Sequence, residues 1–517
     1  MRISSLISAA QPQLFDTPTP VLISQPVRPT FAPTVEMQRA VDMALTREDL
    51  KIVAYAGAGK TSTLVSIAHA MPRSMRGVYA AFNKSIATEA GQRFPRSVKC
   101  STFHSLAYRA TRPQLLQKLQ YARMPGRDIA SIYGVRDTKV RTLTGTDAVV
   151  ESHSLGGIIA DTVARFCRTA AITVLPEHVR LPDLLANEAR AELVTWVVPR
   201  AQAHWDNTMS VHSPVPLSHD SYLKAWALSA PDIRADFILF DEAQDADGVM
   251  LDVLAKQQAQ VIYVGDPYQQ IYEWRGAINA LDAIQAEKTY LTRSFRFGPN
   301  IARAANILLG FLGEDKPLLG TDSIASDVAW QVDGGPEPVD ALLCRTNAVG
   351  IREAVSAHSK GVNICLQVNT AEILGFADAA EALQAGQRPA GSEFRLFRDW
   401  NDLVSFSETI AGSEFRPNVK LVSEHGVPML RDAIHRSVPA ERAQLTISTA
   451  HRAKGLEWDR VRLADDFRLG RQVDGHYVLD ESEARLDYVA LTRARRFVDV
   501  SALTPLIEEA SRELNGF

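Results

Sequence analysis

A glycine-rich turn that ends in a lysine and two hydroxyl residues is the first feature of the sequence suited to chemistry. Residues 54–61 read Ala-Tyr-Ala-Gly-Ala-Gly-Lys-Thr and lie between an apolar run and an expected helix. Glycines let backbone N–H groups close around phosphate oxygens, and the N-terminus of the next helix favours an anion. Lys60 can reach the β- and γ-phosphates, and the Thr61 hydroxyl can bind Mg²⁺. The residues expected to hold the phosphates are Ala56, Gly57, Ala58, Gly59, Lys60, Thr61 and Ser62.

Two adjacent carboxylates follow a second apolar run, residues 237–240, and could complete this site. Ligands of open α/β sheets bind where the strands end. Asp241 would hold Mg²⁺ directly or through water, and Glu242 would orient and deprotonate the attacking water. Neighbouring carboxylates repel, so they need a cation between them or a raised pKa. Taken alone, the first segment could be a glycine-rich turn without a nucleotide, and the second an acidic helix N-cap. Together they predict that a nucleoside triphosphate is bound and hydrolysed.

Further segments, in order along the chain, resemble the motifs of the UvrD/Rep-type superfamily 1 DNA helicases. The most specific is 264–277, Val-Gly-Asp-Pro-Tyr-Gln-Gln-Ile-Tyr-Glu-Trp-Arg-Gly-Ala, which resembles the third motif of that family. The other matching segments are Gln38, 82–84, 102–105, 291–296, 449–458 and 485–494. The resemblance covers about residues 34–505. Within the family the motor is most similar to the F-box DNA helicase branch, although we recognise no F-box in the sequence.

The resemblance implies a role for each matching residue. Gln269 would sense the γ-phosphate or position water, and Arg296 and Arg493 would reach the same phosphate from a second lobe. Arginine suits this role because it is permanently charged and contacts phosphate bidentately. The remaining nucleotide contacts that the resemblance implies are Gln38, which would read the adenine, Phe295, which would stack on it, Gly455 and Glu457.

Single-stranded DNA is the partner that the resemblance implies. Trp274 is the strongest candidate for a stacking platform, since a base on an aromatic face gives roughly 1–3 kcal/mol regardless of sequence. The other implied DNA contacts are Phe82, Asn83, Thr102, Phe103, His104 and His451. Core packing is the alternative for the three aromatic rings Trp274, Phe82 and Phe103. His451 could equally be a buried hydrogen-bonding residue that orients its own motif.

Short apolar runs that alternate with helical segments predict the elements that position these residues. Such alternation indicates parallel sheets wrapped by helices, and two clusters of runs predict two α/β lobes. The expected strands are 52–55, 77–82, 237–240 and 261–264 before residue 290, and 341–344, 461–463 and 497–500 after it. A helix is expected to begin at Thr34. With the resemblance, the expected fold class is α/β, with two RecA-like parallel-sheet motor lobes of the P-loop NTPase type and mostly helical insertions.

The expected domains follow from these clusters. They are a Pro-rich N-terminal tail (1–33), a first RecA-like lobe called 1A (34–110 and 196–290), an insertion called 1B (111–195), a second RecA-like lobe called 2A (291–350 and 441–517) and a reduced insertion similar to 2B (351–440). Six prolines in the tail exclude a helix interior or a central strand there. Insertion 1B is locally basic, and both nucleic-acid binding and an ordinary solvated face remain open for it.

Composition limits the class of protein. The chain has 517 residues, 46% of them hydrophobic and 22% charged, which excludes wholesale disorder and a coiled coil. Its four cysteines form no C-x-x-C pair, so a zinc ribbon or iron–sulfur cluster has no obvious ligands. No apolar run approaches the roughly 20 residues that span a bilayer. We therefore expect a cytoplasmic protein without a membrane partner, nucleoid-associated if bacterial. The net charge of −4 does not exclude a local basic groove.

These observations predict an ATP-dependent DNA helicase or translocase that uses ATP and Mg²⁺. It would move along single-stranded DNA, in the 3′-to-5′ direction that the resemblance implies, and unwind duplex at junctions of single- and double-stranded DNA. One alternative is a DNA-dependent ATPase motor that removes proteins from DNA or serves a partner nuclease, repair or defence complex. A second is a nucleotide-regulated binding module without turnover. The intact set of Glu242, Gln269, Arg296 and Arg493 argues against that module.

Overall fold

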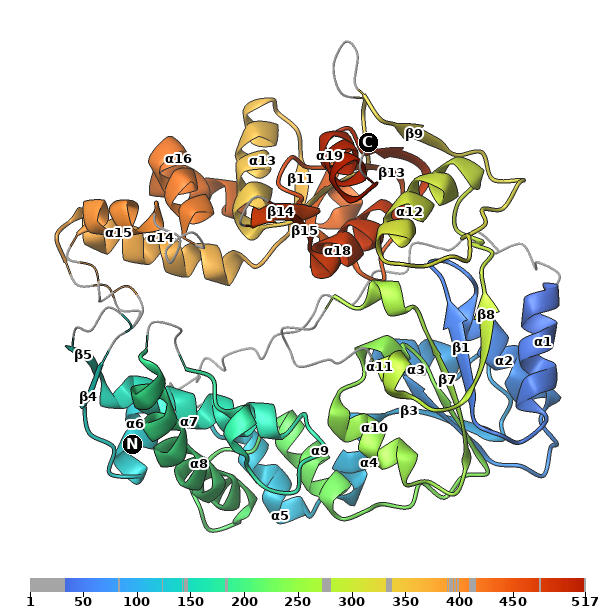
Figure 1. Cartoon of the computed structure of the whole chain (residues 1–517), viewed down its shortest axis with the longest axis horizontal. Coiled ribbons are helices and arrows are strands. Elements are labelled where there is room, and N and C mark those ends of the chain that lie inside the picture. The colour runs from blue at the N-terminus through green and yellow to red at the C-terminus, as the bar shows by residue number, and fades with distance from the viewer. Residues whose placement is uncertain are drawn as a thin grey trace, which may run out of the picture.

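The computed structural model describes most of the chain from residue 33 onward. The described residues are 33–81, 84–122, 124–141, 143, 147–181, 185–271, 280–331, 337–387, 389, 394, 397, 399–408, 415–473 and 476–515. The expected Pro-rich tail therefore lies outside the described residues, apart from Pro33. Figure 1 shows the described part as two α/β lobes, each extended by a group of helices.

Six strands form the sheet of the first lobe, in the lower right part of Figure 1. Their order is β3-β2-β6-β7-β1-β8, and every neighbouring pair is parallel. The strands are β1 (Leu50–Ala54), β2 (Gly77–Ala81), β3 (Val98–Thr102), β6 (Phe237–Phe240), β7 (Gln260–Gly265) and β8 (Glu287–Leu291). Ile238 and Leu239 belong to core clusters on opposite faces, because successive strand side chains alternate. Both faces are thus buried, as parallel sheets require.

Helices cover the two faces of this first sheet. The cluster on one face includes Ala40 of α1 (Val35–Ala44) and Leu64 of α2 (Lys60–Ala70). The expected start of α1 is confirmed, since the Thr34 side chain accepts a hydrogen bond from the Met37 N–H at 3.1 Å. The other face is covered by α4 (Phe103–Ala110), α9 (His219–Leu228) and α10 (Gly248–Ala255). Shorter elements of this lobe are α3 (Lys84–Ala90), η3 (Ala243–Asp245), η4 (Pro267–Gln269) and α11 (Ala280–Ala283).

The second lobe also contains six parallel strands, in the order β11-β12-β10-β13-β16-β9. They are β9 (Asp327–Ala329), β10 (Ala341–Cys344), β11 (Ile364–Gln367), β12 (Leu445–Thr449), β13 (Trp458–Leu463) and β16 (Ala494–Asp499). The helices are α12 (Pro299–Phe311), α13 (Asn347–Ser359), α17 (Ala450–Ala453), α18 (Glu481–Leu491) and α19 (Thr504–Asn515), with a hairpin of β14 (Gly470–Val473) and β15 (His476–Leu479). The expected α/β class with two parallel-sheet lobes is confirmed.

Strand β11 corrects the expected boundary at residue 351. That boundary falls inside α13, and β11 beyond it pairs with β12 in the second sheet. Four residues, Ile-Cys-Leu-Gln, are too few to give a clear periodic signal, which explains the error. The helices beyond β11 are α14 (Thr370–Gln384), α15 (Trp400–Ser407), α16 (Arg416–His435) and η7 (Ala440–Arg442).

The addition to the first lobe is mostly helical, with one short hairpin. Its elements are α5 (Pro113–Leu116), η1 (Gln117–Gln120), α6 (Gly126–Ile132), β4 (Thr138–Arg141), β5 (Asp147–Val150), α7 (Ser152–Phe166), η2 (Pro176–His178) and α8 (Asn187–Met209). Leu155, Phe166, Val197 and Trp205 share one buried cluster, so the addition has its own core. The expected boundary at residue 195 falls within α8.

Lys118 departs from the basic surface that the sequence suggests for this addition. It is fully buried, and its Nζ donates to the backbone carbonyls of Asn207 at 3.0 Å, Thr208 at 2.7 Å and Ser210 at 2.7 Å. These carbonyls end α8, where a cation is favoured by the helix dipole. Lys118 therefore closes a helix rather than contributing to a charged face.

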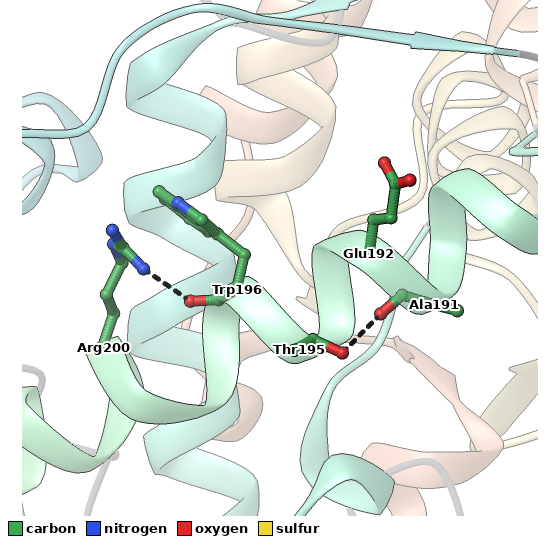
Figure 2. A pocket seen from close by; sticks show the side chains of 5 residues that line it. All are labelled: Ala191, Glu192, Thr195, Trp196 and Arg200. Atoms are coloured by element: carbon green, nitrogen blue, oxygen red, sulfur yellow. Dashed lines mark hydrogen bonds between the residues drawn. The ribbon is translucent and has the colours of Figure 1, made fainter.

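An open hollow of about 570 Å³ lies on α8 (Figure 2). It is lined by Ala191, Glu192, Thr195, Trp196 and Arg200, with the Arg200 guanidinium 4.0 Å from the centre of the Trp196 ring. All five residues come from one helix, and none belongs to the expected nucleotide site. Among the described residues, no helix is long and apolar enough to cross a membrane.

Candidate active site

The turn after β1 adopts the backbone conformation that a phosphate-binding loop needs. Gly57 and Gly59 have φ of +73° and +79°, a region that other residues rarely adopt. The loop also lies close to the linker between the lobes. A Cβ on Gly57 would be 2.5 Å from Ser294 Oγ and 2.7 Å from Arg296 Cβ, and the Phe295 N–H donates to the Gly57 carbonyl at 2.9 Å. Glycine is thus required here by both conformation and space.

The other expected loop residues have local partners. The Ala58 N–H donates to the Tyr55 carbonyl at 3.0 Å, which closes the turn. Ser62 lies in the first turn of α2, and its hydroxyl accepts from the Arg93 guanidinium at 3.0 Å. Ala56 is buried, and its N–H donates to the Tyr488 hydroxyl of the second lobe at 3.1 Å.

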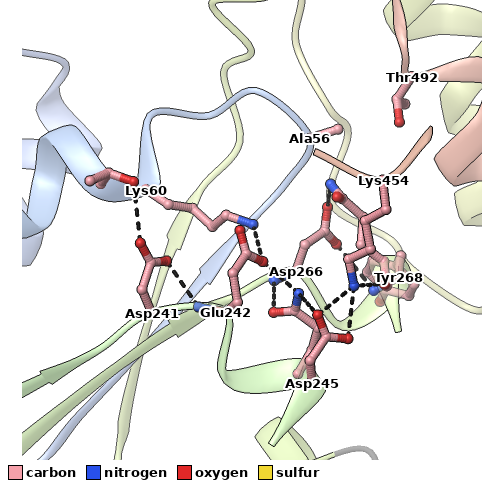
Figure 3. Close-up of polar contacts among 12 residues, drawn as sticks. Ala56, Lys60, Asp241, Glu242, Asp245, Asp266, Tyr268, Lys454 and Thr492 are labelled. Atoms are coloured by element: carbon pink, nitrogen blue, oxygen red, sulfur yellow. Dashed lines mark hydrogen bonds and ion pairs between the residues drawn. The ribbon is translucent and has the colours of Figure 1, made fainter. Parts of the chain in front are cut away.

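The two predicted halves of the phosphate site meet at the ends of β1 and β6 (Figure 3). The Lys60 Nζ lies 2.8 Å from Glu242 Oε2 and forms an ion pair with it. The Thr61 hydroxyl donates to Asp241 Oδ2 at 3.2 Å, and the Tyr79 hydroxyl donates to the same oxygen at 2.7 Å. Thr61 and Asp241, the expected magnesium ligands, therefore lie side by side.

The adjacent carboxylates have opposite pKa shifts. Burial and the neighbouring Glu242 carboxylate raise the pKa of Asp241. Burial alone would also raise the pKa of Glu242, but the ammonium groups of Lys60 and Lys454 lower it to about 2. The backbone of Glu242 is left-handed, with φ of 55°, and its Oε2 accepts from Gln244 Nε2 at 2.6 Å. Glu242 is thus ionised at neutral pH and held by two donors.

Asp266 organises the residues of the third motif. Its Oδ2 accepts from Gln269 Nε2 at 2.7 Å and from the Tyr488 hydroxyl at 3.3 Å. Its N–H donates to Gln244 Oε1 at 3.0 Å, which links this segment to the carboxylates after β6. Burial raises the pKa of Asp266 to about 6. Gln269 is consequently buried, with its amide group held by Asp266.

Both expected arginines reach this site from the second lobe. Arg493 is 1% exposed and donates to Gln269 Oε1 at 3.4 Å. Burial and the nearby Arg296 lower the pKa of Arg493 to about 9, so it remains a cation at neutral pH. Arg296 pairs with Glu457 at 2.9 Å and donates to the Thr492 carbonyl at 3.0 Å. The five residues expected to be catalytic therefore surround one site at the lobe boundary.

Phe295, the residue expected to stack on the adenine, lies at the edge of the loop. A Cβ on Gly59 would be 2.7 Å from Met37 Cε and 3.5 Å from the Phe295 ring, so these two side chains flank the loop. Gln38 is exposed and donates to Asp42 Oδ1 at 2.9 Å. Gly455 has φ of +85° with open space around it. Met37 is a contact that sequence reasoning missed, because an apolar residue one position before Gln38 carries no motif signal.

Two further residues connect the lobes and were also missed. The Lys454 Nζ lies 2.7 and 2.5 Å from the two Asp245 carboxylate oxygens and donates to the Gln269 carbonyl at 2.7 Å. The Tyr488 hydroxyl joins the Ala56 N–H to Asp266, as described above. Both residues belong to segments that match the family, and their presence there is the only signal that the sequence offered.

Four of the seven expected DNA contacts lie among the described residues, and Phe82, Asn83 and Trp274 lie outside them. The Thr102 hydroxyl accepts from the Ser105 N–H at 3.1 Å and caps α4. Phe103 is 2% exposed, and its ring centre is 5.4 Å from that of Phe240 in an edge-on contact. Of the two roles left open for Phe103, the structure shows core packing. As the first residue of α4, it faces the sheet and packs into the core.

The two histidines differ in accessibility. The His104 side chain is 35% exposed, and its Nε2 is 3.7 Å from Asp220 Oδ1. Its ring also contacts Tyr222 edge-on, with 6.1 Å between the ring centres. His451 is half-buried and hydrogen-bonded to the Ile271 backbone. Burial and the Arg345 cation lower the pKa of His451. His104 is thus open to a ligand, while His451 has the hydrogen-bonding environment of the alternative role.

Two family models match the chain. An AAA domain matches residues 37–275, and the UvrD-like helicase C-terminal domain matches residues 396–503. The chain is 28% identical to F-box DNA helicase 1 of Gallus gallus over 502 residues, which are 90% of this chain and 48% of that protein. It is 30% identical to F-box DNA helicase protein 1 of Schizosaccharomyces pombe over 508 residues, which are 90% of this chain and 56% of that protein.

A bacterial relative matches a shorter region. ATP-dependent DNA helicase PcrA of Leuconostoc citreum is 27% identical over 356 residues, which are 61% of this chain and 44% of that protein. The chain spans about half the length of the two F-box helicases that it matches.

Proposed function

Because the chain belongs to the UvrD-like helicases of superfamily 1, we propose that it is an ATP-driven motor that moves along single-stranded DNA and unwinds duplex. The observation that carries this proposal is the site at the lobe boundary. Lys60, Asp241 and Glu242 come from the first lobe, and Arg296 and Arg493 come from the second. A site divided in this way couples nucleotide state to lobe position.

The residues present fit a nucleotide with Mg²⁺. Two left-handed glycines shape the loop, and Lys60 pairs with a carboxylate that a phosphate can replace. Thr61 and Asp241 would hold the metal, whose chemistry is to neutralise charge on the β- and γ-phosphates. Mg²⁺ commonly combines one or two protein oxygens with phosphate oxygens and waters, so a complete protein cage is not required.

Glu242 is the general base in this proposal. Its low pKa reflects the ion pair with Lys60. When Lys60 turns to the phosphates, Glu242 loses that partner, so its pKa rises and it becomes a better proton acceptor. Gln244 keeps the carboxylate oriented during this exchange, through its hydrogen bond of 2.6 Å. Nucleotide binding itself would therefore activate the base.

The second-lobe arginines complete the site. Arg493 already contacts Gln269, and Arg296 pairs with Glu457 and the Thr492 carbonyl. An arginine that completes a phosphoryl-transfer site is worth on the order of 10³–10⁵ in turnover. Hydrolysis would then require the second lobe to be in place, and product release would let it move.

The motor divides into a first lobe (34–110 and 210–291) with its insertion (111–209), and a second lobe (292–369 and 441–515) with its insertion (370–440). Single-stranded DNA would cross both lobes, with His104 and Trp274 among its contacts. The motor would move along this strand in the 3′-to-5′ direction. Alternating grip by the two lobes would turn opening and closing into translocation along DNA of any sequence.

Strand displacement on tailed duplexes tests this function. We expect the purified protein with ATP and Mg²⁺ to displace a strand from a 3′-tailed duplex and not from a 5′-tailed one. The Glu242→Gln variant should retain single-strand binding while DNA-stimulated turnover falls on the order of 10²–10⁴-fold, as expected for loss of a general base. Displacement from the 5′-tailed duplex alone would reverse the proposed polarity. ATP turnover that DNA does not stimulate would overturn the motor proposal.

A further inference from the structure

Tyr55 lies immediately before the phosphate loop, yet its side chain packs in the core of the second lobe. It is fully buried and shares a hydrophobic cluster with Phe297, Ile301 and Leu308. Phe297 precedes α12, and Ile301 and Leu308 are on that helix. A residue of the first lobe is thus anchored among apolar side chains of the second.

Glu314 of the second lobe binds two tyrosines of the first. The Tyr268 hydroxyl donates to Glu314 Oε2 at 2.9 Å, and the Tyr55 hydroxyl also bonds this carboxylate and lies 3.2 Å from the Lys316 carbonyl. The two tyrosine rings contact each other with 6.1 Å between their centres. One carboxylate therefore joins two separate segments of the first lobe.

The backbone holds Glu314 firmly in place. Gly313, with φ of +76°, follows the C-cap of α12, and the Glu314 N–H donates to the Leu309 carbonyl at 3.0 Å. This is the pattern of a helix closed by a left-handed glycine. A carboxylate near a helix C-terminus is disfavoured by the helix dipole. Burial alone would raise the pKa of Glu314, but the Lys316 N–H and the two tyrosine hydroxyls lower it, so these donors keep the carboxylate ionised there.

Both tyrosines adjoin residues that face the nucleotide site. Tyr55 precedes Ala56, whose N–H contacts the second-lobe Tyr488. Tyr268 precedes Gln269, which contacts Asp266, Lys454 and Arg493. A shift of Glu314 relative to the first lobe would therefore move the backbone on both sides of the γ-phosphate position.

We propose that Glu314 is a positioning residue that sets the phosphate loop and Gln269 relative to the second lobe, through the Tyr55 and Tyr268 hydroxyls. The proposal rests on the proposed function, since it names the residue through which nucleotide occupancy is transmitted to α12. Glu314 itself does not touch the nucleotide. Its effect would appear in the coupling between the lobes and not in nucleotide affinity.

Glu314→Ala tests this role, with Asp315→Ala as the matched control because Asp315 is the adjacent, exposed acid. Glu314→Ala removes the acceptor of both tyrosine hydroxyls. We expect it to lower DNA-stimulated kcat at least roughly tenfold, with little change in KM for ATP, because a single hydrogen bond to a charged group is worth about 1.5–3 kcal/mol. Glu314→Gln retains an acceptor oxygen and should recover part of the loss. Tyr268→Phe should cost less in the Glu314→Ala background than alone. Equal kcat and DNA stimulation in Glu314→Ala and Asp315→Ala would overturn the proposal.

Hydrogen exchange separates this inference from the proposed function. On addition of a non-hydrolysable ATP analogue with Mg²⁺, the wild type should gain protection both in the phosphate loop and in residues 306–318. Glu314→Ala should keep the first and lose the second. If wild-type ATP turnover does not respond to DNA but protection at 306–318 still depends on Glu314, the motor proposal fails and the positioning role stands. Unchanged protection at 306–318 in Glu314→Ala overturns the role.

Discussion

Lys60 in the phosphate loop and Lys118 at the base of the first-lobe insertion are both largely removed from water, but they have different partners. Lys60 pairs with the Glu242 carboxylate, and Lys118 donates to three backbone carbonyls. Burial alone would lower the pKa of both ammonium groups. The Glu242 and Asp241 carboxylates instead raise the pKa of Lys60, whereas burial lowers the pKa of Lys118.

This difference distinguishes an exchangeable lysine from a structural one. A carboxylate can be replaced by a phosphate, because both are anions that accept from an ammonium group. Helix-terminal carbonyls have no such substitute, and they would be left without donors if the ammonium group moved away. Burial of a lysine therefore indicates nothing about function until the charge of its partners is known.

Between the two lysines, the larger effect is expected for Lys60→Ala, on turnover. Loss of a donor aimed at the charge that develops in the transition state lowers kcat on the order of 10³-fold. Steady-state ATPase assays with saturating single-stranded DNA would measure it. Lys118→Met is the control variant in this assay, and we expect its ATP turnover per folded molecule to equal that of the wild type. Residual Lys60→Ala activity within tenfold of the wild type would show that Lys60 is not part of the reacting site.

Lys118→Met should have the next largest effect, on stability. Three carbonyls at the end of α8, that of the buried Thr208 among them, would lose their donor, so we expect the free energy of unfolding to fall by about 3 kcal/mol. Urea denaturation followed by circular dichroism would measure this change. Lys139→Met is the matched control, because Lys139 is an exposed residue of the same insertion. Similar unfolding midpoints for the two variants would contradict the structural role of Lys118.

The buried acid Asp266 should make the free energy of unfolding depend on pH. Its folded pKa of about 6 exceeds that of an unfolded aspartate, so the native state binds the proton more tightly. This contribution is present below the unfolded pKa and is lost as pH rises through 6. The wild type should lose on the order of 2 kcal/mol relative to Asp266→Asn between pH 4 and pH 7. If the free energies of unfolding of the two proteins changed with pH in the same way, the raised pKa of Asp266 would be refuted.

The smallest effect is expected for Phe103→Leu. Because the ring packs against Phe240 in the core, a change of shape should cost about 1 kcal/mol of stability. Affinity for single-stranded DNA, measured by fluorescence anisotropy, should stay within twofold of the wild type. His104→Ala, which changes the adjacent exposed ring, should weaken it. A tenfold loss of affinity in Phe103→Leu would show instead that Phe103 contacts DNA.

The sequence predicted those parts of the molecule that depend on local pattern. The Gly57–Thr61 turn and the Asp241–Glu242 pair each follow an apolar strand, and parallel strands bring their carboxyl ends to one edge. The lobe containing Arg493 was also predictable, because a family motif identifies it. Strand β11 was missed, since four residues give too little periodicity for a prediction.

Contacts between distant segments were not predictable from pattern. Phe103 matches a DNA-contacting motif, but its burial depends on α9 and β6, which are more than 100 residues away. The same holds for Lys454 with Asp245 and for Tyr488 with Ala56, which meet only because the lobes do. The sequence groups Lys118 with several surface cations, because its contact with the end of α8 joins residues 90 positions apart.

The burial of Tyr55 among second-lobe side chains has a mechanical consequence. Withdrawing a whole aromatic ring from that cluster would cost roughly 2 kcal/mol or more, so the two halves of the molecule stay attached at this point. When the polar contacts elsewhere at the lobe boundary open, the lobes would turn about this point. Displacement then grows in proportion to distance from the pivot, and a small rearrangement around the phosphates becomes a longer stroke at a remote surface. Tyr55 would be the pivot of this rotation, and the distance from Tyr55 to the DNA-binding surface would set the size of the translocation step.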